Sequence, residues 1–161
     1  KVIDLIIIKF KILLKQGEKM KKFETFEHGA DIGIRGYGKT LEEAFEQSAL
    51  AMFEVITDTK TVEPNDKREV TVTAEDEYLL LYEWLEELLF LYDTENLVFS
   101  EFKVEISGDE DEGYTLSGLA KGEVFNREKH EPRTEVKAIT LNMMEIIKSK
   151  DLVKVRFVLD I

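Results

Sequence analysis

Two hydrophobic periods along the chain predict two kinds of secondary structure. Apolar residues recur at three-four spacing over Leu41–Ile56, which predicts an amphipathic helix with one buried face. Thr40 and Glu43 form a capping box at its start, in which each side chain satisfies a free backbone donor. The same spacing predicts a second helix from about Asp76 to Tyr92, with leucines facing inward and glutamates facing outward.

Segments with a period of two predict strands, because successive side chains of a strand point to opposite faces. One is the glycine-rich run Ile32–Gly38, whose glycines let a second backbone or a ligand come close. Four more alternate in the same way: residues 70–74, 102–106, 116–124 and 153–161. We therefore predict an α+β fold, a single-domain sandwich of mostly antiparallel β-sheet with two main α-helices packed on it.

Residues 107–113 contain two glycines and four short acids between two of these strands, which suits a hairpin turn. The acids lack the glycine-centred spacing of a calcium-binding hand. A solvated turn is the favoured interpretation, and calcium binding is the alternative.

Residues 1–20 form an N-terminal extension ahead of a domain that spans residues 21–161. The apolar run Val2–Leu14 is interrupted by Lys9 and Lys11 and is shorter than the roughly 20 residues that a membrane-spanning helix needs. It also lacks the small-residue cleavage site of a signal peptide. Its alternation predicts an added edge strand that the lysines protect. We hypothesise that Met20 is the true start of the protein or an alternative one.

The charge balance limits the classes of partner. The chain has 34 acidic and 22 basic residues, a net charge of −12, which opposes approach to the phosphates of a nucleic acid. We therefore expect no direct tight nucleic-acid binding and no membrane association. The charge favours contact with a basic protein surface, or it only keeps the protein soluble. Cysteine is absent, so any metal must be held by oxygen or imidazole.

Three short segments contain the candidate chemistry. His28 and Asp31 lie three residues apart, directly before two glycines. Lys137 lies in the segment Thr134–Thr140, and Asp160 is the second-last residue. Alternation puts Asp31 and Asp160 opposite their apolar neighbours, so the core requires neither of them. On this pattern alone both are exposed acids at strand ends. His28 is a ligand, a proton carrier or a turn histidine, and Lys137 points to solvent.

The basic residues are concentrated in one region, which comprises Lys121, Arg127, Lys129, His130 and Arg133. This concentration either contacts a nucleotide or an acidic surface, or it counterbalances the acidic remainder of the chain. The sequence shows no nucleophile-and-base pair, no phosphate loop and no dinucleotide fingerprint. We therefore predict no enzymatic activity of its own.

Taken together, the His-Gly-Ala-Asp-Ile-Gly opening, the Glu-Val-Lys-Ala-Ile-Thr segment and the Asp-Ile ending resemble the archease family. The resemblance covers about residues 21–161. It departs from the family pattern at Gly29, where Thr is common, at Leu141, where an aromatic residue is common, and in the residues before Met20. No hydroxyl at position 29 can therefore be required.

The resemblance implies a metal site. It places Asp31 and Asp160 beside one another around a divalent cation, calcium, manganese or magnesium, which relieves the repulsion between two carboxylates. We add the terminal carboxylate of Ile161 as a candidate third oxygen donor. The resemblance also implies that Lys137 acts near the metal, where it steadies a carboxylate or meets a partner's phosphate.

The resemblance also implies a function. Archeases activate the GTP-dependent, manganese-using RNA ligase of the RtcB type in tRNA splicing, promoting guanylylation of the ligase and repeated turnover. We therefore expect a cytoplasmic protein cofactor of that ligase. A chaperone-like modulator of a tRNA methyltransferase is the alternative, and a metal-dependent hydrolase is a third hypothesis, for which we find no positioned base.

Overall fold

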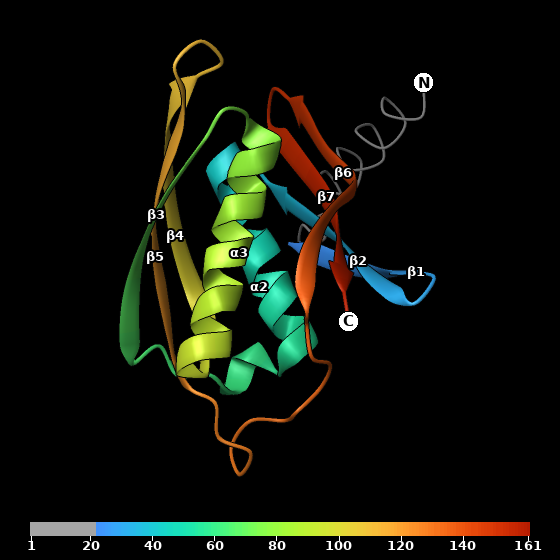
Figure 1. Ribbon diagram of the computed structural model, residues 1–161, viewed down its shortest axis with the longest axis vertical. Helices are drawn as coiled ribbons and strands as arrows, with labels where there is room; N and C mark the ends of the chain where they lie inside the picture. Colours follow the sequence, from blue (N-terminus) through green and yellow to red (C-terminus); the bar gives the residue numbers. More distant parts are fainter. Residues whose placement is uncertain (1–21) are drawn as a thin grey trace.

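The computed structural model describes residues 22–161, which form two antiparallel sheets with a layer of two helices between them (Figure 1). The four-stranded sheet has the order β1-β2-β7-β6, and the three-stranded sheet has the order β3-β5-β4. The elements are β1 Phe23–His28, β2 Asp31–Gly38, α2 Leu41–Ile56, the short 3₁₀ helix η1 Thr59–Thr61, β3 Asp66–Ala74, α3 Glu77–Glu95, β4 Leu97–Asp109, β5 Gly113–Val124, β6 Ala138–Ser149 and β7 Leu152–Asp160. The predicted α+β fold is confirmed.

Both helices form where the pattern predicts them. α2 begins after Thr40, whose hydroxyl accepts a hydrogen bond from the backbone N–H of Glu43. The Glu43 carboxylate accepts from the backbone N–H of Lys39, one residue before the position that the capping box predicts. α3 ends at Asn96, whose left-handed φ of 57° closes the helix, and so it runs one turn beyond the predicted end.

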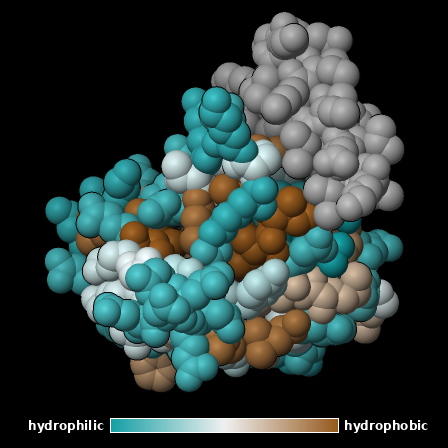
Figure 2. All heavy atoms as spheres, turned by 90° about the horizontal axis from the view of Figure 1, so that it is seen from above, coloured by the Kyte–Doolittle hydropathy of each residue, from teal (hydrophilic) through white to brown (hydrophobic). Residues whose placement is uncertain are grey.

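The hydrophobic core fills the space between the two sheets and around the helices. α2 packs on β2 and β4, one from each sheet, and its side chains Phe45, Met52 and Phe53 are fully buried. The predicted close approach at the glycines of β2 is confirmed, because a Cβ atom at Gly38 would lie 2.6 Å from the backbone nitrogen of Ala44. Seen from above in Figure 2, hydrophobic residues lie in the middle of the molecule, where hydrophilic residues cross and flank them.

The acidic loop between β4 and β5 is a tight turn. One carboxylate oxygen of Asp109 accepts hydrogen bonds from the backbone N–H groups of Asp111 (3.0 Å) and Glu112 (2.8 Å). Gly108 and Gly113 flank it with positive φ values of 107° and 87°. The first acid of the loop therefore shapes the hairpin turn that the sequence predicts.

Of the seven strands within residues 22–161, the alternation predicts all but β1 and β6. β1 carries an aromatic residue on each face, Phe23 on one and Phe26 on the other. Apolar and polar residues therefore do not alternate along this strand. β6 is interrupted: Thr140 pairs with Val158, but Glu145 already pairs with Arg156, so β6 has extra residues that bulge out. This bulge exposes Leu141 (51%) and Met143 (44%).

The predicted edge strand in residues 1–20 and the hypothesis about Met20 lie outside the described residues. Within residues 22–161, no helix is both long enough and apolar enough to cross a membrane.

Candidate functional site

The β1–β2 hairpin places the first two candidate residues opposite each other. His28 and Asp31 form the last cross-strand pair, joined only by Gly29 and Ala30. A two-residue hairpin turn of this kind requires a positive φ, and Gly29 has a φ of 62°. Nothing lies within 4 Å of where its Cβ would be, so the backbone conformation, not space, favours glycine here.

The register between β2 and β7 brings the two predicted metal carboxylates together. Ile32 pairs with Leu159, and continuing that register by one position sets Asp31 opposite Asp160. Opposed residues of antiparallel strands have Cα atoms about 4.5–5.5 Å apart. On the other side of β7, Asp160 pairs with Ala138. His28, Asp31, Asp160 and Ala138 therefore form one row across all four strands, which we name the end row.

The two carboxylates of the end row project from the same face of the sheet. Val155, Phe157 and Leu159 of β7 point into the core and are fully buried, so Asp160 must point the other way, and it is exposed. In the same way, Asp31 is followed by Ile32, which packs against the core, so the Asp31 side chain points away from the core. Both acids lie on the face turned away from the helices, which we name the outer face.

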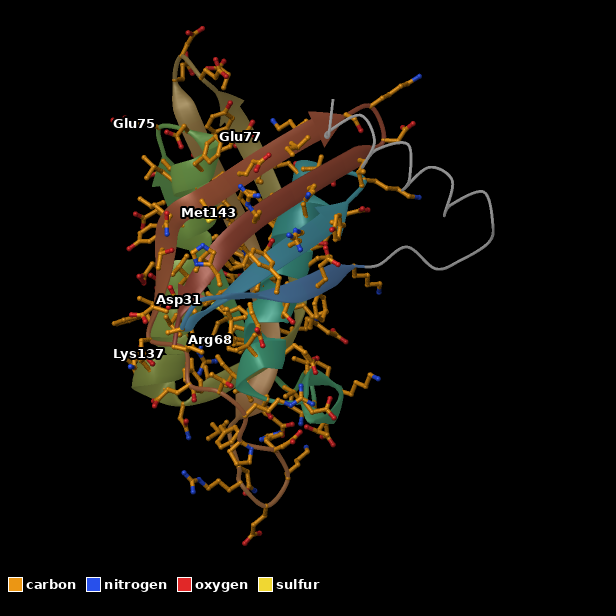
Figure 3. All side chains as sticks on the ribbon, turned by 90° about the vertical axis from the view of Figure 1, so that its right-hand side faces the viewer. Asp31, Arg68, Glu75, Glu77, Lys137 and Met143 are labelled. Atoms are coloured by element: carbon orange, nitrogen blue, oxygen red, sulfur yellow. The ribbon has the colours of Figure 1, made fainter. Side chains whose placement is uncertain are left out.

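Lys137 is held at the same end of the molecule by its backbone. Its N–H donates a 2.8 Å hydrogen bond to the backbone carbonyl of Asp160, directly before β6 begins. Its side chain is exposed, and Figure 3 shows Lys137 and Asp31 at the same end of the four-stranded sheet. The three sequence segments that contain the candidate residues thus meet in space.

The candidate side chains are not used by the fold. Within residues 22–161, the side chains of His28, Asp31, Lys137 and Asp160 make no hydrogen bond and no ion pair. Each keeps its full capacity to donate or accept, so the end row can bind an external ligand without breaking an internal contact.

The end row offers a divalent cation only part of a coordination shell. Two carboxylates in register supply the oxygen donors that hard cations prefer. In the described part of the chain, no group of three or more His, Asp or Glu side chains comes close enough to hold a metal ion. His28 therefore does not complete such a group with Asp31 and Asp160, and the Ile161 side chain packs against the core. A cation held by these two carboxylates would take its remaining ligands from water or from a partner.

Three members of the basic concentration, Lys129, His130 and Arg133, contact carboxylates of the chain. Lys129 Nζ lies 2.9 Å from Glu123 and 3.2 Å from Glu63. Burial alone would raise the pKa of Glu123, but the hydrogen bonds from Lys129, the Glu63 backbone and His130 hold that pKa below its usual range. His130 is buried, and its Nδ1 accepts from the backbone N–H of Asn126.

Arg133 makes ion pairs in the same way, at 2.6 Å with Glu54 and 3.0 Å with Glu131. Of the two interpretations of the basic concentration, the structure favours the counterbalance.

Three cations of the outer face were not singled out by the sequence analysis. Arg35 lies on β2, and Lys154 and Arg156 lie on β7. The signal that could have found them is alternation, because each lies an even number of residues from Asp31 or Asp160 in its strand. Separation in the chain hides the cluster, since β2 and β7 are brought together only by the fold.

The Archease protein family model matches residues 23–161 of the chain. Protein archease of Methanothermobacter thermautotrophicus is 53% identical over 142 residues, covering 88% of this chain and 100% of that protein. Protein archease of Thermococcus kodakarensis is 57% identical over 132 residues, covering 82% of this chain and 92% of that protein.

Two solved structures are similar. The solution structure of protein 1598 from Methanobacterium thermoautotrophicum matches with a TM-score of 0.78 and 53% identity, covering 88% of this chain and 100% of the other. A crystal structure from Thermotoga maritima, described as an archease and possible chaperone, matches with a TM-score of 0.55 and 19% identity, covering 89% and 99%. The second likeness shows the fold alone.

Proposed function

The chain belongs to the archease family, and on that premise we propose that it is an accessory protein of an RNA ligase. In this proposal it activates the GTP-dependent RtcB-type ligase of tRNA splicing, and it promotes guanylylation and multiple turnover of that enzyme. The protein catalyses no step itself and acts as a protein cofactor.

One observation carries the proposal: three side chains of the end row, together with the adjacent Lys137, are chemically capable and are not used by the fold. His28, Asp31, Lys137 and Asp160 come from three separate segments and make no side-chain hydrogen bond or ion pair within residues 22–161. A fold gains nothing from like-charged acids in adjacent strands, because like charges directly opposite each other are destabilising. An external cation and a partner protein account for their placement.

The acids of the end row and the adjacent Lys137 have separable roles in this proposal. Asp31 and Asp160 hold calcium, manganese or magnesium through their oxygens, and such an ion supplies positive charge for binding phosphate or carboxylate oxygens. Lys137 donates to an anionic group of the partner. The net charge of −12 attracts the basic surface that an RNA-binding ligase must carry.

The test measures formation of guanylylated ligase and the number of turnovers, with and without this protein. Asp31→Asn and Asp160→Asn keep the shape of each side chain and remove its charge, so activation should be lost. Asp151→Asn is the matched control, because Asp151 is an exposed acid in the turn before β7, at the opposite end of that strand. If both end-row variants fold and still activate the ligase as well as wild type, the proposed role of the end row is wrong.

A second candidate function is a chaperone-like modulator of a tRNA methyltransferase. The exposed Leu141 and Met143 of the β6 bulge favour it, because apolar residues on a surface mark contacts with other proteins. This function depends on apolar area. Leu141→Ser with Met143→Ser should then abolish protection of the methyltransferase from aggregation, and Asp31→Asn should leave it intact. The opposite pattern would remove this candidate.

A further inference from the structure

The outer face contains a charged row that crosses all four strands. Glu24 pairs with Arg35, Arg35 pairs with Arg156, and Arg156 pairs with Glu145, in the order β1, β2, β7 and β6. The outer two members are acids and the inner two are arginines. Lys154 lies two residues from Arg156 on β7 and pairs with Tyr37. Three cations therefore meet at the centre of the outer face, and we name them the cation cluster.

The arrangement of the cation cluster works against folding. Like charges directly opposite each other in an antiparallel pair are destabilising, and here Arg35 faces Arg156. The flanking acids each pair with one arginine: Glu24 lies 3.3 Å from Arg35, and Glu145 lies 2.6 Å from Arg156. Within residues 22–161, two carboxylates pair with members of a cluster of three cations, which leaves a surplus positive charge there in a chain whose net charge is −12.

Lys154 is the member of the cation cluster that has no carboxylate partner within the described residues. Within residues 22–161 its ammonium group makes no ion pair and no hydrogen bond. Burial lowers the pKa of Lys154 below its usual range. The positive charges of Arg35 and Arg156 lower this pKa further, and the carboxylates of Glu145 and Glu24 act in the opposite direction. A half-buried ammonium group without a partner is costly, and an anion between the three cations would remove the cost.

The two arginines keep donors for such an anion. Arg35 uses one terminal nitrogen for Glu24, and its guanidinium carbon lies 4.1 Å from the centroid of the Phe26 ring, which fixes its plane. Arg156 uses Nε for the backbone carbonyl of Met143 and one terminal nitrogen for Glu145. Each guanidinium has a terminal nitrogen that contacts no acceptor within residues 22–161, and both side chains remain partly exposed, 29% and 27%.

The end row does not cancel this positive charge. Arg35 lies four residues from Asp31 along β2, and Arg156 lies four residues from Asp160 along β7. Four residues of a strand span about 13 Å, beyond the Debye length of about 8 Å at physiological ionic strength. Between the two rows the Phe26 ring covers Gly33, where a Cβ would lie 2.1 Å from Phe26 Cζ. Along the outer face, the acidic end row is therefore followed by an apolar zone around Phe26 and then by the cation cluster.

We propose that Arg35, Lys154 and Arg156 bind a phosphate group, either free phosphate or the terminal phosphate of a nucleotide. Guanidinium groups match the geometry of phosphate oxygens, and the lysine supplies a mobile point charge. This site is separate from the end row and does not depend on the proposed ligase activation.

The experiment titrates inorganic phosphate into the full chain in a chloride buffer and follows backbone amide shifts by NMR. Saturable shifts should centre on β2 and β7. Lys154→Met should weaken phosphate binding on the order of tenfold, the change that corresponds to about 1.4 kcal/mol. Lys154→Arg, which keeps the charge, should retain binding. Lys103→Met is the matched control, since Lys103 is an exposed lysine on β4 of the other sheet.

Guanosine monophosphate and guanosine separate the two sources of phosphate. If the monophosphate binds and guanosine does not, the site takes terminal phosphates. If only inorganic phosphate binds, the site takes the free anion. The proposal is overturned if millimolar phosphate causes no saturable shift on β2 and β7, or if Lys103→Met weakens binding as much as Lys154→Met does.

A purely structural lysine would behave differently. Without phosphate, Lys154→Met should leave the thermal midpoint unchanged or raise it, because an unpaired half-buried charge is removed. A lowered midpoint together with unchanged phosphate binding would assign Lys154 to stability and would also overturn the proposal.

Discussion

The end row and the loop between β5 and β6 use the same side-chain types in opposite ways. In the loop, Lys129, His130 and Arg133 are each paired with a carboxylate of the chain. In the end row, Asp31 and Asp160 make no ion pair within residues 22–161. Pairing in the loop holds a segment that has no strand or helix of its own. A charge left unpaired contributes nothing to folding, so it is available for an external ligand.

The largest expected effect is on metal binding at the end row. Asp31→Asn combined with Asp160→Asn should weaken Mn²⁺ binding on the order of hundredfold, about 2.7 kcal/mol, because both charged oxygen donors are lost. Calorimetry or Mn²⁺ electron paramagnetic resonance measures the affinity. Asp151→Asn should bind as wild type does. Equal Mn²⁺ affinity in all three proteins would show that the end row holds no metal.

In the loop, removing the buried histidine should lower stability. His130→Ala leaves the backbone N–H of Asn126 without its partner, removes one of the contacts of the Glu123 carboxylate, and opens a cavity beside Phe125. We expect a loss of about 2 kcal/mol in the free energy of unfolding. Urea denaturation measures it, with Arg127→Ala as the exposed control. A change below about 0.5 kcal/mol would mean that the loop does not depend on this pairing.

The stability that the charged contacts of the loop provide should depend on pH through Glu123. Because its folded pKa lies below the usual value, its contribution is fully present above the unfolded pKa of about 4.3 and is lost as the pH falls through the folded value. Glu123→Gln should therefore be less stable than wild type by about 1 kcal/mol near pH 7, and the difference should shrink at about pH 3. Urea midpoints at both pH values measure this. A difference that grows on acidification would contradict the assignment.

The smallest expected effect is on stability when Lys137 is changed. Only its backbone is tied to Asp160, so Lys137→Met should alter the free energy of unfolding by less than about 0.5 kcal/mol. Ligase activation should nevertheless fall. If urea denaturation shows a loss of more than about 1 kcal/mol, the Lys137 side chain stabilises the fold, as the paired charges of the loop do.

Much of the fold could be predicted from local pattern. The N-cap residues Thr40 and Asp76 act through neighbours in the chain, so the starts of α2 and α3 follow from a few adjacent residues. β1 and β6 could not be predicted in the same way. Their residues depend on what lies over each face, and in β6 on a bulge whose Met143 adopts a φ of 58°.

The same distinction applies to the candidate site: local pattern predicted some of its features, and others depend on the tertiary structure. The motifs around Asp31 and Asp160 identified two carboxylates on the face opposite the core, because alternation is a local property. The basic residues from Lys121 to Arg133 are visible in the sequence. The ion pairs of Lys129 with Glu63 and Glu123, and of Arg133 with Glu54, could not be predicted from it. Ion pairs between residues far apart in the chain depend on tertiary distance.

By itself the sequence determined which residues form helices, which face of most strands is buried, and where the candidate chemistry lies in the chain. Only the tertiary structure decided the register of β2 against β7, which sets Asp31 opposite Asp160 and Arg35 opposite Arg156. The physical reason is that periodicity arises from bonded geometry within one segment. Register between distant strands is selected by the packing of the whole core, which no single segment contains.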